Sequence, residues 1–295
     1  MSTYIIAECG VNHEGNIETA KQMIYAAKEA DADAVKFTCY IAENYINKNF
    51  KERFELAKKF ELSKENFIEL HDLAKKCNIE FILTPLCFQT LEFARKYCNI
   101  IKIASGDIIY SNFLYAASQT DREIIISTAA SNILEIKNAV RMLEVHRRSI
   151  TNTVSILHCI ASYPTQQTDV NLNSILYLRE KFPNNIIGYS DHTNDTFACE
   201  LAVLMGAQII EKHFTLDRNG KTFHDHFISA NTDEFKKMVD KIRFIPYMLG
   251  LKEKKCFLCE IEKRDYLRRG MVAITDIGCG DTITNEKIKM VRPKI

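Results

Sequence analysis

The chain alternates short β-branched runs with longer segments of helical spacing, and this alternation constrains its fold more than any other feature. The candidate strands are Tyr4–Ala7, Ala34–Phe37, Glu80–Leu83, Ile100–Ala104, Glu123–Ile126, Val154–His158, Asn185–Tyr189 and Ala207–His213. Eight strand–helix units in about 250 residues match a closed (β/α)₈ TIM barrel. A doubly wound open sheet is the alternative, but no G-x-G-x-x-G follows the first strand.

Two segments depart from the alternation. Residues Cys39–Leu62 are longer than an ordinary strand-to-helix loop and carry many charged and aromatic side chains. We expect them to form an insertion over the mouth of the barrel. After residue 251 the alternation stops, so the predicted division is a barrel at 1–251, a linker at 252–268 and a short segment at 269–295. That last segment is too short to bury a core of its own.

The overall composition is that of an ordinary globular protein. Lys and Arg total 39 and Asp and Glu total 38, which gives no support for a nucleic-acid partner or a polybasic membrane contact. The sequence shows neither a secretory signal nor a membrane-spanning run. We therefore expect a cytoplasmic protein whose ten cysteines are mostly reduced, with the C-x-x-C of Cys256 and Cys259 incidental.

Reactive side chains gather where the predicted strands end, and the carboxyl ends of the strands hold the chemistry of such barrels. Burying Lys36, Lys102 and Lys212 in one barrel would be costly without anionic partners. Hydroxyl groups follow other strands, at Thr84, Ser105, Ser127 and Ser190. Cations and hydroxyls together favour a receptor for a phosphate and a carboxylate.

Two histidines end adjacent predicted strands, His192 and His213. Neutral imidazole nitrogens suit a transition-metal ion, with water or substrate oxygens at the open positions. Asp225, shortly after the last strand, could add a carboxylate or a substrate contact. The neighbouring His224 is expected to be a loop residue.

Ordered motifs along nearly the whole chain resemble those of the bacterial sialic acid (nonulosonate) synthases. They are Ile6-Ala-Glu-Cys-Gly-Val-Asn-His-Glu-Gly15, Ala32-Asp-Ala-Val-Lys-Phe37, Thr84-Pro85, Lys102-Ile-Ala-Ser-Gly-Asp107, Ser127-Thr128, His158-Cys159, Tyr163-Pro164, Gly188-Tyr-Ser-Asp-His192 and Glu211-Lys-His-Phe-Thr215. Residues 269–293 resemble the start of that family's antifreeze-like (SAF) domain.

The resemblance implies a (β/α)₈ barrel enzyme, a carbon–carbon bond-forming transferase. It would condense phosphoenolpyruvate with an N-acetylated amino sugar, such as N-acetylmannosamine, to a nine-carbon 2-keto acid and phosphate. It implies a divalent metal, Mn²⁺ or else Mg²⁺ or Co²⁺, on His192 and His213, and a homodimer with a swapped antifreeze-like domain. The resemblance also implies roles for other residues. Proton handling or sugar contact falls to Glu8 and Asp107, and sugar binding to Tyr163, Asp225 and Arg292. The residues implied to bind phosphoenolpyruvate are Lys36, Thr84, Lys102, Ser105, Ser127 and Ser190.

Some positions depart from the family pattern. Thr38 stands where the family usually has glutamine and Cys87 where it usually has aspartate, so the acceptor sugar stays open between N-acetylmannosamine and diacetamido sugars of the legionaminic or pseudaminic kind. Gly10-Val-Asn12 favours the first two of these. The antifreeze-like segment is about half the family's length, which points to a truncated record or a natural short form. The alternatives are a non-catalytic relative that binds sugar or phosphate, and another phosphoenolpyruvate-dependent keto-acid synthase.

Overall fold

The computed structural model describes residues 3–147, 154–219, 221 and 223–292, and the chain divides into two compact units. The first unit is Met1–Met248 and the second is Leu249–Ile295. Each is described by itself below.

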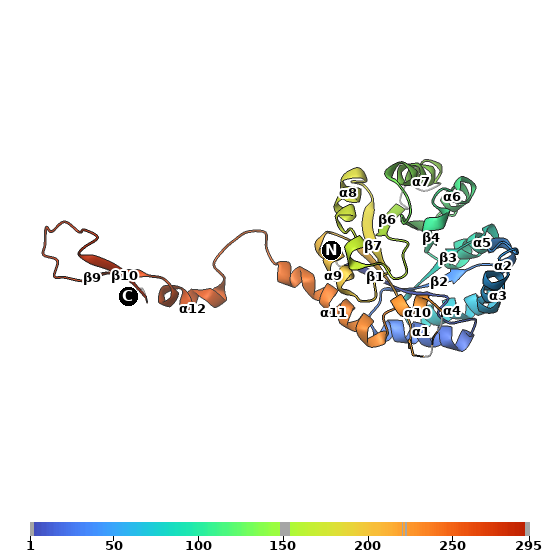
Figure 1. The fold of residues 1–295 in the computed structure, drawn as a ribbon, viewed down its shortest axis with the longest axis horizontal. Helices are drawn as coiled ribbons and strands as arrows, with labels where there is room; N and C mark the ends of the chain where they lie inside the picture. Colours follow the sequence, from blue (N-terminus) through green and yellow to red (C-terminus); the bar gives the residue numbers. More distant parts are fainter. Residues whose placement is uncertain (1–2, 148–153, 220, 222, 293–295) are drawn as a thin grey trace. The chain divides into compact units, whose positions relative to one another are not determined.

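The first unit is a closed barrel of parallel strands, seen in Figure 1 with helices around the strands. Neighbours in sequence pair in order, and β1 pairs with β8 to close the barrel. The strands are β1 Tyr4–Gly10, β2 Ala34–Cys39, β3 Glu80–Pro85, β4 Ile100–Ile103, β5 Glu123–Ser127, β6 Val154–Cys159, β7 Ile186–Asp191 and β8 Ile209–His213. The predicted (β/α)₈ barrel is confirmed, and the open-sheet alternative is wrong.

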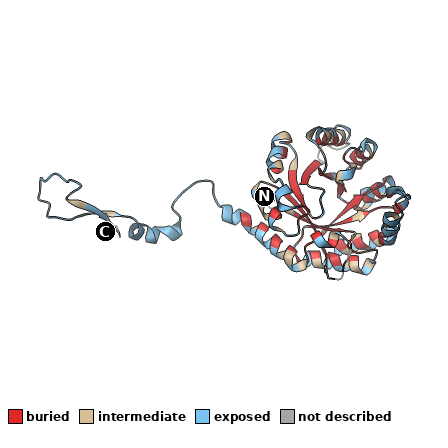
Figure 2. Cartoon of the chain, in the orientation of Figure 1, coloured by how far each residue is buried: buried red, intermediate tan, exposed pale blue. Residues whose placement is uncertain are grey.

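Helices follow every strand and cover the outside of the barrel. Each buries one face against the strands, as α1 does with Ala20, Met23, Ile24 and Ala27, and Figure 2 shows the buried residues concentrated on the strands and on the helix faces turned to them. The covering helices are α1 Ile17–Glu29, α4 Lys64–Lys76, α5 Phe88–Tyr97, α6 Ser111–Ser118, α7 Ile133–His146, α8 Asn173–Lys181, α9 Phe197–Leu204 and α11 Thr232–Leu249.

Capping side chains explain where two of these helices begin. Ser63 precedes α4 and accepts a hydrogen bond from the backbone N–H of Asn66, whose side chain accepts one from the backbone N–H of Ser63. Asn132 and Glu135 form the same reciprocal arrangement before α7. Such a capping box satisfies backbone donors that the first turn of a helix leaves free.

The interior of the barrel changes from apolar to charged along the strands. One layer is apolar and consists of Ile6, Ala34, Ile82, Ile125, Leu157 and Ile209. Because side chains on a strand alternate between faces, the residues two positions further on point into the same interior. Those residues are Glu8, Lys36, Thr84, Ser127, Cys159 and Glu211. The alternation therefore places the charged groups at the carboxyl ends of the strands, next to this apolar layer.

The long segment after β2 forms two short helices, α2 Ala42–Tyr45 and α3 Lys51–Phe60. Tyr40, Tyr45, Leu56 and Phe60 from this segment line the cavity at the carboxyl ends of the strands. The predicted insertion over the barrel mouth is thus confirmed. A further short helix, α10 Asp225–Ile228, follows β8, and single 3₁₀ turns lie at Ser105–Asp107 and Gln167–Asp169.

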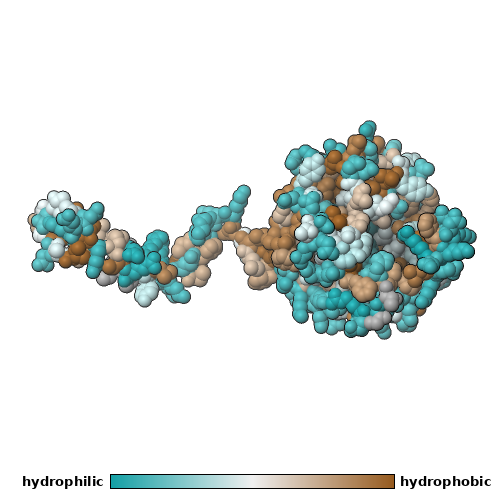
Figure 3. All heavy atoms as spheres, in the orientation of Figure 1, coloured by the Kyte–Doolittle hydropathy of each residue, from teal (hydrophilic) through white to brown (hydrophobic). Residues whose placement is uncertain are grey.

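The second unit contains α12 Leu258–Leu267 and an antiparallel pair, β9 Gly270–Ala273 and β10 Ile288–Val291. None of its described residues is buried. Large apolar side chains such as Leu258, Tyr266 and Met271 are exposed, and apolar residues of this unit are visible on its surface in Figure 3. The unit therefore lacks a core of its own, as its length predicts.

Across the described ranges, no helix is both long and apolar enough to cross a membrane.

Candidate active site

A cavity of about 650 Å³ opens at the carboxyl ends of the barrel strands. Strands on all sides of the barrel, the α2–α3 insertion and the segment after β8 contribute to its wall. Most of the predicted site residues lie on this wall: Glu8, Lys36, Thr84, Lys102, Ser105, Ser127, Tyr163, Ser190, His192, His213 and Asp225. The structure thus brings together side chains that are up to about 217 positions apart in the chain.

The floor of the cavity holds two lysines and two glutamates. Lys36 forms an ion pair with Glu8, donates a hydrogen bond from Nζ to Oγ1 of Thr84 at 2.9 Å, and lies 3.7 Å from Oε2 of Glu211. Nζ of Lys102 lies 3.5 Å from Oε1 of Glu211. Both lysines are 3% exposed. The two cations are therefore held nearly dry, where their attraction for an anionic ligand is strong.

The two glutamates differ in their electrostatic surroundings. Burial raises the pKa of Glu8, Lys36 opposes the rise and Glu211 adds to it. Burial also acts to raise the pKa of Glu211, but Lys102 and Lys36 outweigh it and hold that pKa low. Two nearby carboxyl groups whose pKa values are pushed apart favour a protonated and an ionised partner. Of the two, Glu8 has the carboxyl group that takes up a proton more readily.

Hydroxyl groups surround the lysines. Oγ of Ser127 is buried and has no hydrogen-bond partner. Oγ of Ser190 donates to Oε1 of Glu211 at 2.8 Å, and Oγ of Ser105 accepts from the backbone N–H of Ala129 at 3.1 Å. A buried hydroxyl group without a hydrogen-bond partner lowers the stability of the folded protein. The free donor of Ser127 fits a ligand oxygen in the cavity.

His192 and His213 lie together at the rim, with ring centroids 5.2 Å apart. Burial lowers the pKa of both; the Ile160 carbonyl opposes the shift at His192, and Asp225 opposes it at His213, whose pKa falls to about 3. Both rings are therefore neutral at neutral pH and can offer a lone pair to a metal ion.

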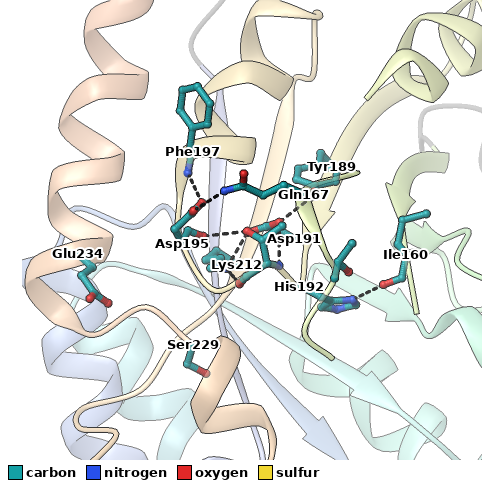
Figure 4. Close-up of polar contacts among 12 residues, drawn as sticks. Ile160, Gln167, Tyr189, Asp191, His192, Asp195, Phe197, Lys212, Ser229 and Glu234 are labelled. Carbon is teal, nitrogen blue, oxygen red and sulfur yellow. Dashed lines mark hydrogen bonds and ion pairs between the residues drawn. The ribbon is translucent and has the colours of Figure 1, made fainter. Parts of the chain in front are cut away.

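The surroundings of the two rings fit a metal ion. Nδ1 of His192 lies 2.6 Å from the carbonyl oxygen of Ile160, the kind of outer contact that orients metal-binding histidines (Figure 4). Nδ1 of His213 is buried without a hydrogen-bond partner and lies 3.9 Å from Oδ2 of Asp225. Within the described residues no group of three or more His, Cys, Asp or Glu forms a complete ligand set. Water or substrate oxygens would have to complete the coordination.

Aromatic side chains form the outer wall of the cavity. The Tyr163 ring stacks on His192 with a centroid distance of 4.1 Å. His224 contacts Oδ1 of Asp225 at 2.9 Å. Arg53 and Phe223 line the same wall. This end of the cavity presents stacked rings, apolar faces and a few polar groups, which suits a small ligand with both apolar and polar groups.

Two predicted site residues, Asp107 and Arg292, are not among the wall residues of this cavity. Asp107 is on the 3₁₀ turn after β4, next to the wall residues Ser105 and Gly106 but not itself on the wall. Burial raises its pKa to about 6. Arg292 belongs to the second unit and is exposed there. Asp107 is therefore not a wall residue of the cavity, and the roles of Asp107 and Arg292 stay predictions.

The expectation that Lys212 binds an anion inside the barrel is wrong. It alternates with Glu211 and His213, so its side chain leaves the opposite face of β8, where Nζ contacts Oδ2 of Asp191 at 2.6 Å. Sequence reasoning instead missed Glu211 as a site residue. The same alternation identifies it, since Glu211 is two residues before His213 and shares its face.

Arg53 and His224 are further wall residues that the sequence interpretation did not assign to the site. Arg53 lies on an insertion helix, and no periodic pattern relates it to the barrel strands. His224 is in a loop as expected, at the start of α10.

Comparisons with known proteins agree with this architecture. The model of the family described as the NeuB family matches residues 23–254. An uncharacterised protein of Methanocaldococcus jannaschii is 42% identical over 99% of this chain and 85% of its own length. The N,N'-diacetyllegionaminic acid synthase of Legionella pneumophila is 35% identical over 99% of this chain and 86% of its own length.

One solved structure is similar to this chain in both fold and sequence. The N-acetylneuraminic acid (sialic acid) synthetase of Leptospira borgpetersenii, crystallised with citrate, superimposes with a TM-score of 0.81 at 35% identity. The match covers 90% of this chain and 91% of that one.

Proposed function

The chain belongs to the NeuB family, and from this premise we propose that it condenses phosphoenolpyruvate with an N-acetylated amino sugar to a nine-carbon 2-keto acid and phosphate. It is a synthase of the carbon–carbon bond-forming transferase class. One observation carries the proposal: two buried lysines and a free hydroxyl lie in the same cavity as two neutral histidines.

The lysine end of the cavity would bind phosphoenolpyruvate. Lys36 and Lys102 supply positive charge for its phosphate and carboxylate, and the hydroxyl groups of Thr84, Ser105, Ser127 and Ser190 supply neutral donors. Because the lysines are nearly excluded from water, they also stabilise the charge that shifts as phosphate departs.

The reaction forms one carbon–carbon bond and breaks one carbon–oxygen bond. C3 of the enol attacks the aldehyde carbon of the sugar, water adds at C2, and the tetrahedral intermediate releases phosphate. A protonated Glu8 can give its proton to the aldehyde oxygen and, as carboxylate, accept one from the attacking water. Asp107, whose pKa burial raises to about 6, is a second candidate for the carboxylate that accepts the proton of the attacking water.

His192 and His213 would hold a divalent cation, with Mn²⁺ the expected ion and Mg²⁺ or Co²⁺ the alternatives. Such an ion supplies Lewis acidity to the aldehyde oxygen when bound. The rings lie beside Tyr163 and Asp225, so the aldehyde end of the sugar would be held at the same rim.

The outer wall would bind the acceptor sugar through Tyr163 and Asp225. Stacked and apolar side chains on this wall, including Tyr45 and Phe60, can contact the methyl groups of acetamido substituents. The candidate acceptors are N-acetylmannosamine and the diacetamido sugars that give legionaminic or pseudaminic acid, with Gly10-Val-Asn12 favouring the first two.

The second unit would complete the site in a homodimer. Its apolar side chains are exposed and none of its residues from 249 to 292 is buried, which supports a role in which another surface covers it. As a partial antifreeze-like domain, residues 269–295 would lie over the partner's barrel, and Arg292 would then reach the partner's sugar.

Phosphate release tests the proposal. The full chain with Mn²⁺ and phosphoenolpyruvate is offered each of the three acceptor sugars, with and without a chelator. Release that depends on one sugar and is lost with chelator supports the proposal and identifies the acceptor. Release without sugar, or none with any sugar, would refute it. Gel filtration with light scattering tests the homodimer.

A further inference from the structure

Asp191 and Lys212 form a buried ion pair that the proposed reaction does not use. Asp191 is 0% exposed and Lys212 1% exposed, and neither lies on the wall of the cavity. Taking two charges out of water costs several kcal/mol per ion, so a buried pair is seldom explained by stability alone. Their positions in the chain are informative, since Asp191 directly precedes His192 and Lys212 directly precedes His213.

Both side chains of the pair form hydrogen bonds with residues at the end of β7. Nζ of Lys212 donates to Oδ2 of Asp191 and to the carbonyl oxygen of Thr193, each at 2.6 Å. Oδ1 of Asp191 accepts from the Tyr189 hydroxyl at 2.7 Å and from the backbone N–H of Thr193 at 3.2 Å. Oδ2 also accepts from the Thr193 hydroxyl at 2.9 Å.

These contacts fix the backbone on both sides of His192. Residues 191 and 193 are both hydrogen-bonded to Lys212 of the neighbouring strand, and Figure 4 shows Lys212 beside Asp191. In the sequence Lys212 directly precedes His213. The His192 ring is fixed separately by the Ile160 carbonyl of the β6 side. The network therefore links the two backbone segments from which the His192 and His213 side chains extend.

We propose that the Asp191–Lys212 pair is a positioning element that holds His192 and His213 at the spacing needed to bind one divalent cation. This inference rests on the metal site of the proposed function. It assigns a role to two charges that lie outside the cavity and contact neither substrate. It also explains why a charged pair, and not a pair of apolar side chains, is buried on the outer face of the barrel strands.

The test measures Mn²⁺ binding to the metal-free full chain by electron paramagnetic resonance, without substrates. The double variant Asp191→Asn/Lys212→Met removes both charges, so that no unpaired charge stays buried. Changes to groups that orient metal ligands typically weaken metal affinity by about 10- to 100-fold, and we expect a loss of that size. The affinity for phosphoenolpyruvate in the absence of metal should stay unchanged, because Lys36 and Lys102 are untouched.

The control is Asp33→Asn/Arg243→Met, which changes a partly exposed ion pair. It removes another ion pair, with a 2.7 Å contact that links the start of the barrel to α11, far along the strands from the histidines. The control should bind Mn²⁺ like the wild type. If the Asp191/Lys212 variant does not fold, Thr193→Val removes one hydroxyl contact to Asp191 and should still weaken Mn²⁺ binding several-fold.

The possible outcomes separate this inference from the proposed function. Wild-type Mn²⁺ affinity in a folded double variant, or in Thr193→Val where the double variant does not fold, overturns the positioning role and leaves the synthase proposal intact. An equal loss of Mn²⁺ and phosphoenolpyruvate binding overturns it too, because it shows general loosening. A wild-type chain that binds no Mn²⁺ overturns both this inference and the metal assignment.

Discussion

Removing Lys102 should weaken the use of phosphoenolpyruvate much more than the use of the sugar. Lys102→Met keeps most of the side-chain volume and removes the cation. Lys36 is already paired with Glu8, whereas within the described residues Lys102 forms an ion pair with Glu211 alone, so Lys102 has the greater capacity for a new anion. Burial lowers the pKa of Lys102, which an incoming anion would offset.

The expected size follows from the loss of one contact to a charged group. Such a hydrogen bond contributes about 1.5–3 kcal/mol. Since about 1.4 kcal/mol is a factor of ten, the KM for phosphoenolpyruvate should rise about 10- to 150-fold. Glu211 stays bound to Ser190 at 2.8 Å and near Lys36 at 3.7 Å, so the barrel should remain folded.

The assay is initial-rate phosphate release at varied phosphoenolpyruvate and saturating sugar, then the reverse. Thermal unfolding checks the fold, and Lys75→Met, which removes an exposed lysine, is the matched control. A change confined to the KM for the sugar would show that the phosphate site has been placed at the wrong end of the cavity.

Further predictions concern the metal, pH and packing. His213→Ala should abolish chelator-sensitive turnover while circular dichroism stays that of the wild type; turnover that chelator never affects, even in the wild type, would contradict the metal assignment. Because burial raises the pKa of Asp107 to about 6, its carboxylate is protonated below that pH, so wild-type kcat/KM should fall as pH drops through 6 and Asp107→Asn should lack that limb. An identical pH profile in the variant would remove Asp107 from the proton transfer. Gly188→Ala should destabilise the barrel by about 1–3 kcal/mol in urea unfolding, since a Cβ there would lie 2.5 Å from the Ile209 carbonyl oxygen and 2.5 Å from Cδ2 of Leu157; unchanged stability would show that the strands can move apart.

The barrel itself could be predicted from the sequence because its strands and helices have different periods. The run Ala34–Phe37 is apolar and short, whereas Ile17–Ala30 repeats its apolar residues at helical spacing. Parallel strands of a barrel end on the same side, so residues far apart, such as Glu8 and His213, could be expected at one site. This argument needs only the order of the strands along the chain.

The sequence argument failed where the face of a strand decided the outcome. Lys212 and Glu211 are adjacent, and the order of strands does not reveal which one enters the barrel. The alternation along β8 decides between them, since Glu211 shares the face of His213 and the lysine therefore lies on the outside. Arg53 could not be found at all, because the fold of the insertion depends on packing that no period encodes.

The most direct test of the proposed synthase is the stoichiometry of its reaction. Phosphoenolpyruvate consumed, phosphate released and keto acid formed are measured together, the last by mass spectrometry of the product. The proposal predicts equal amounts of all three and a product that contains every carbon of both substrates. Phosphate released with pyruvate, and without a nine-carbon keto acid, would contradict it.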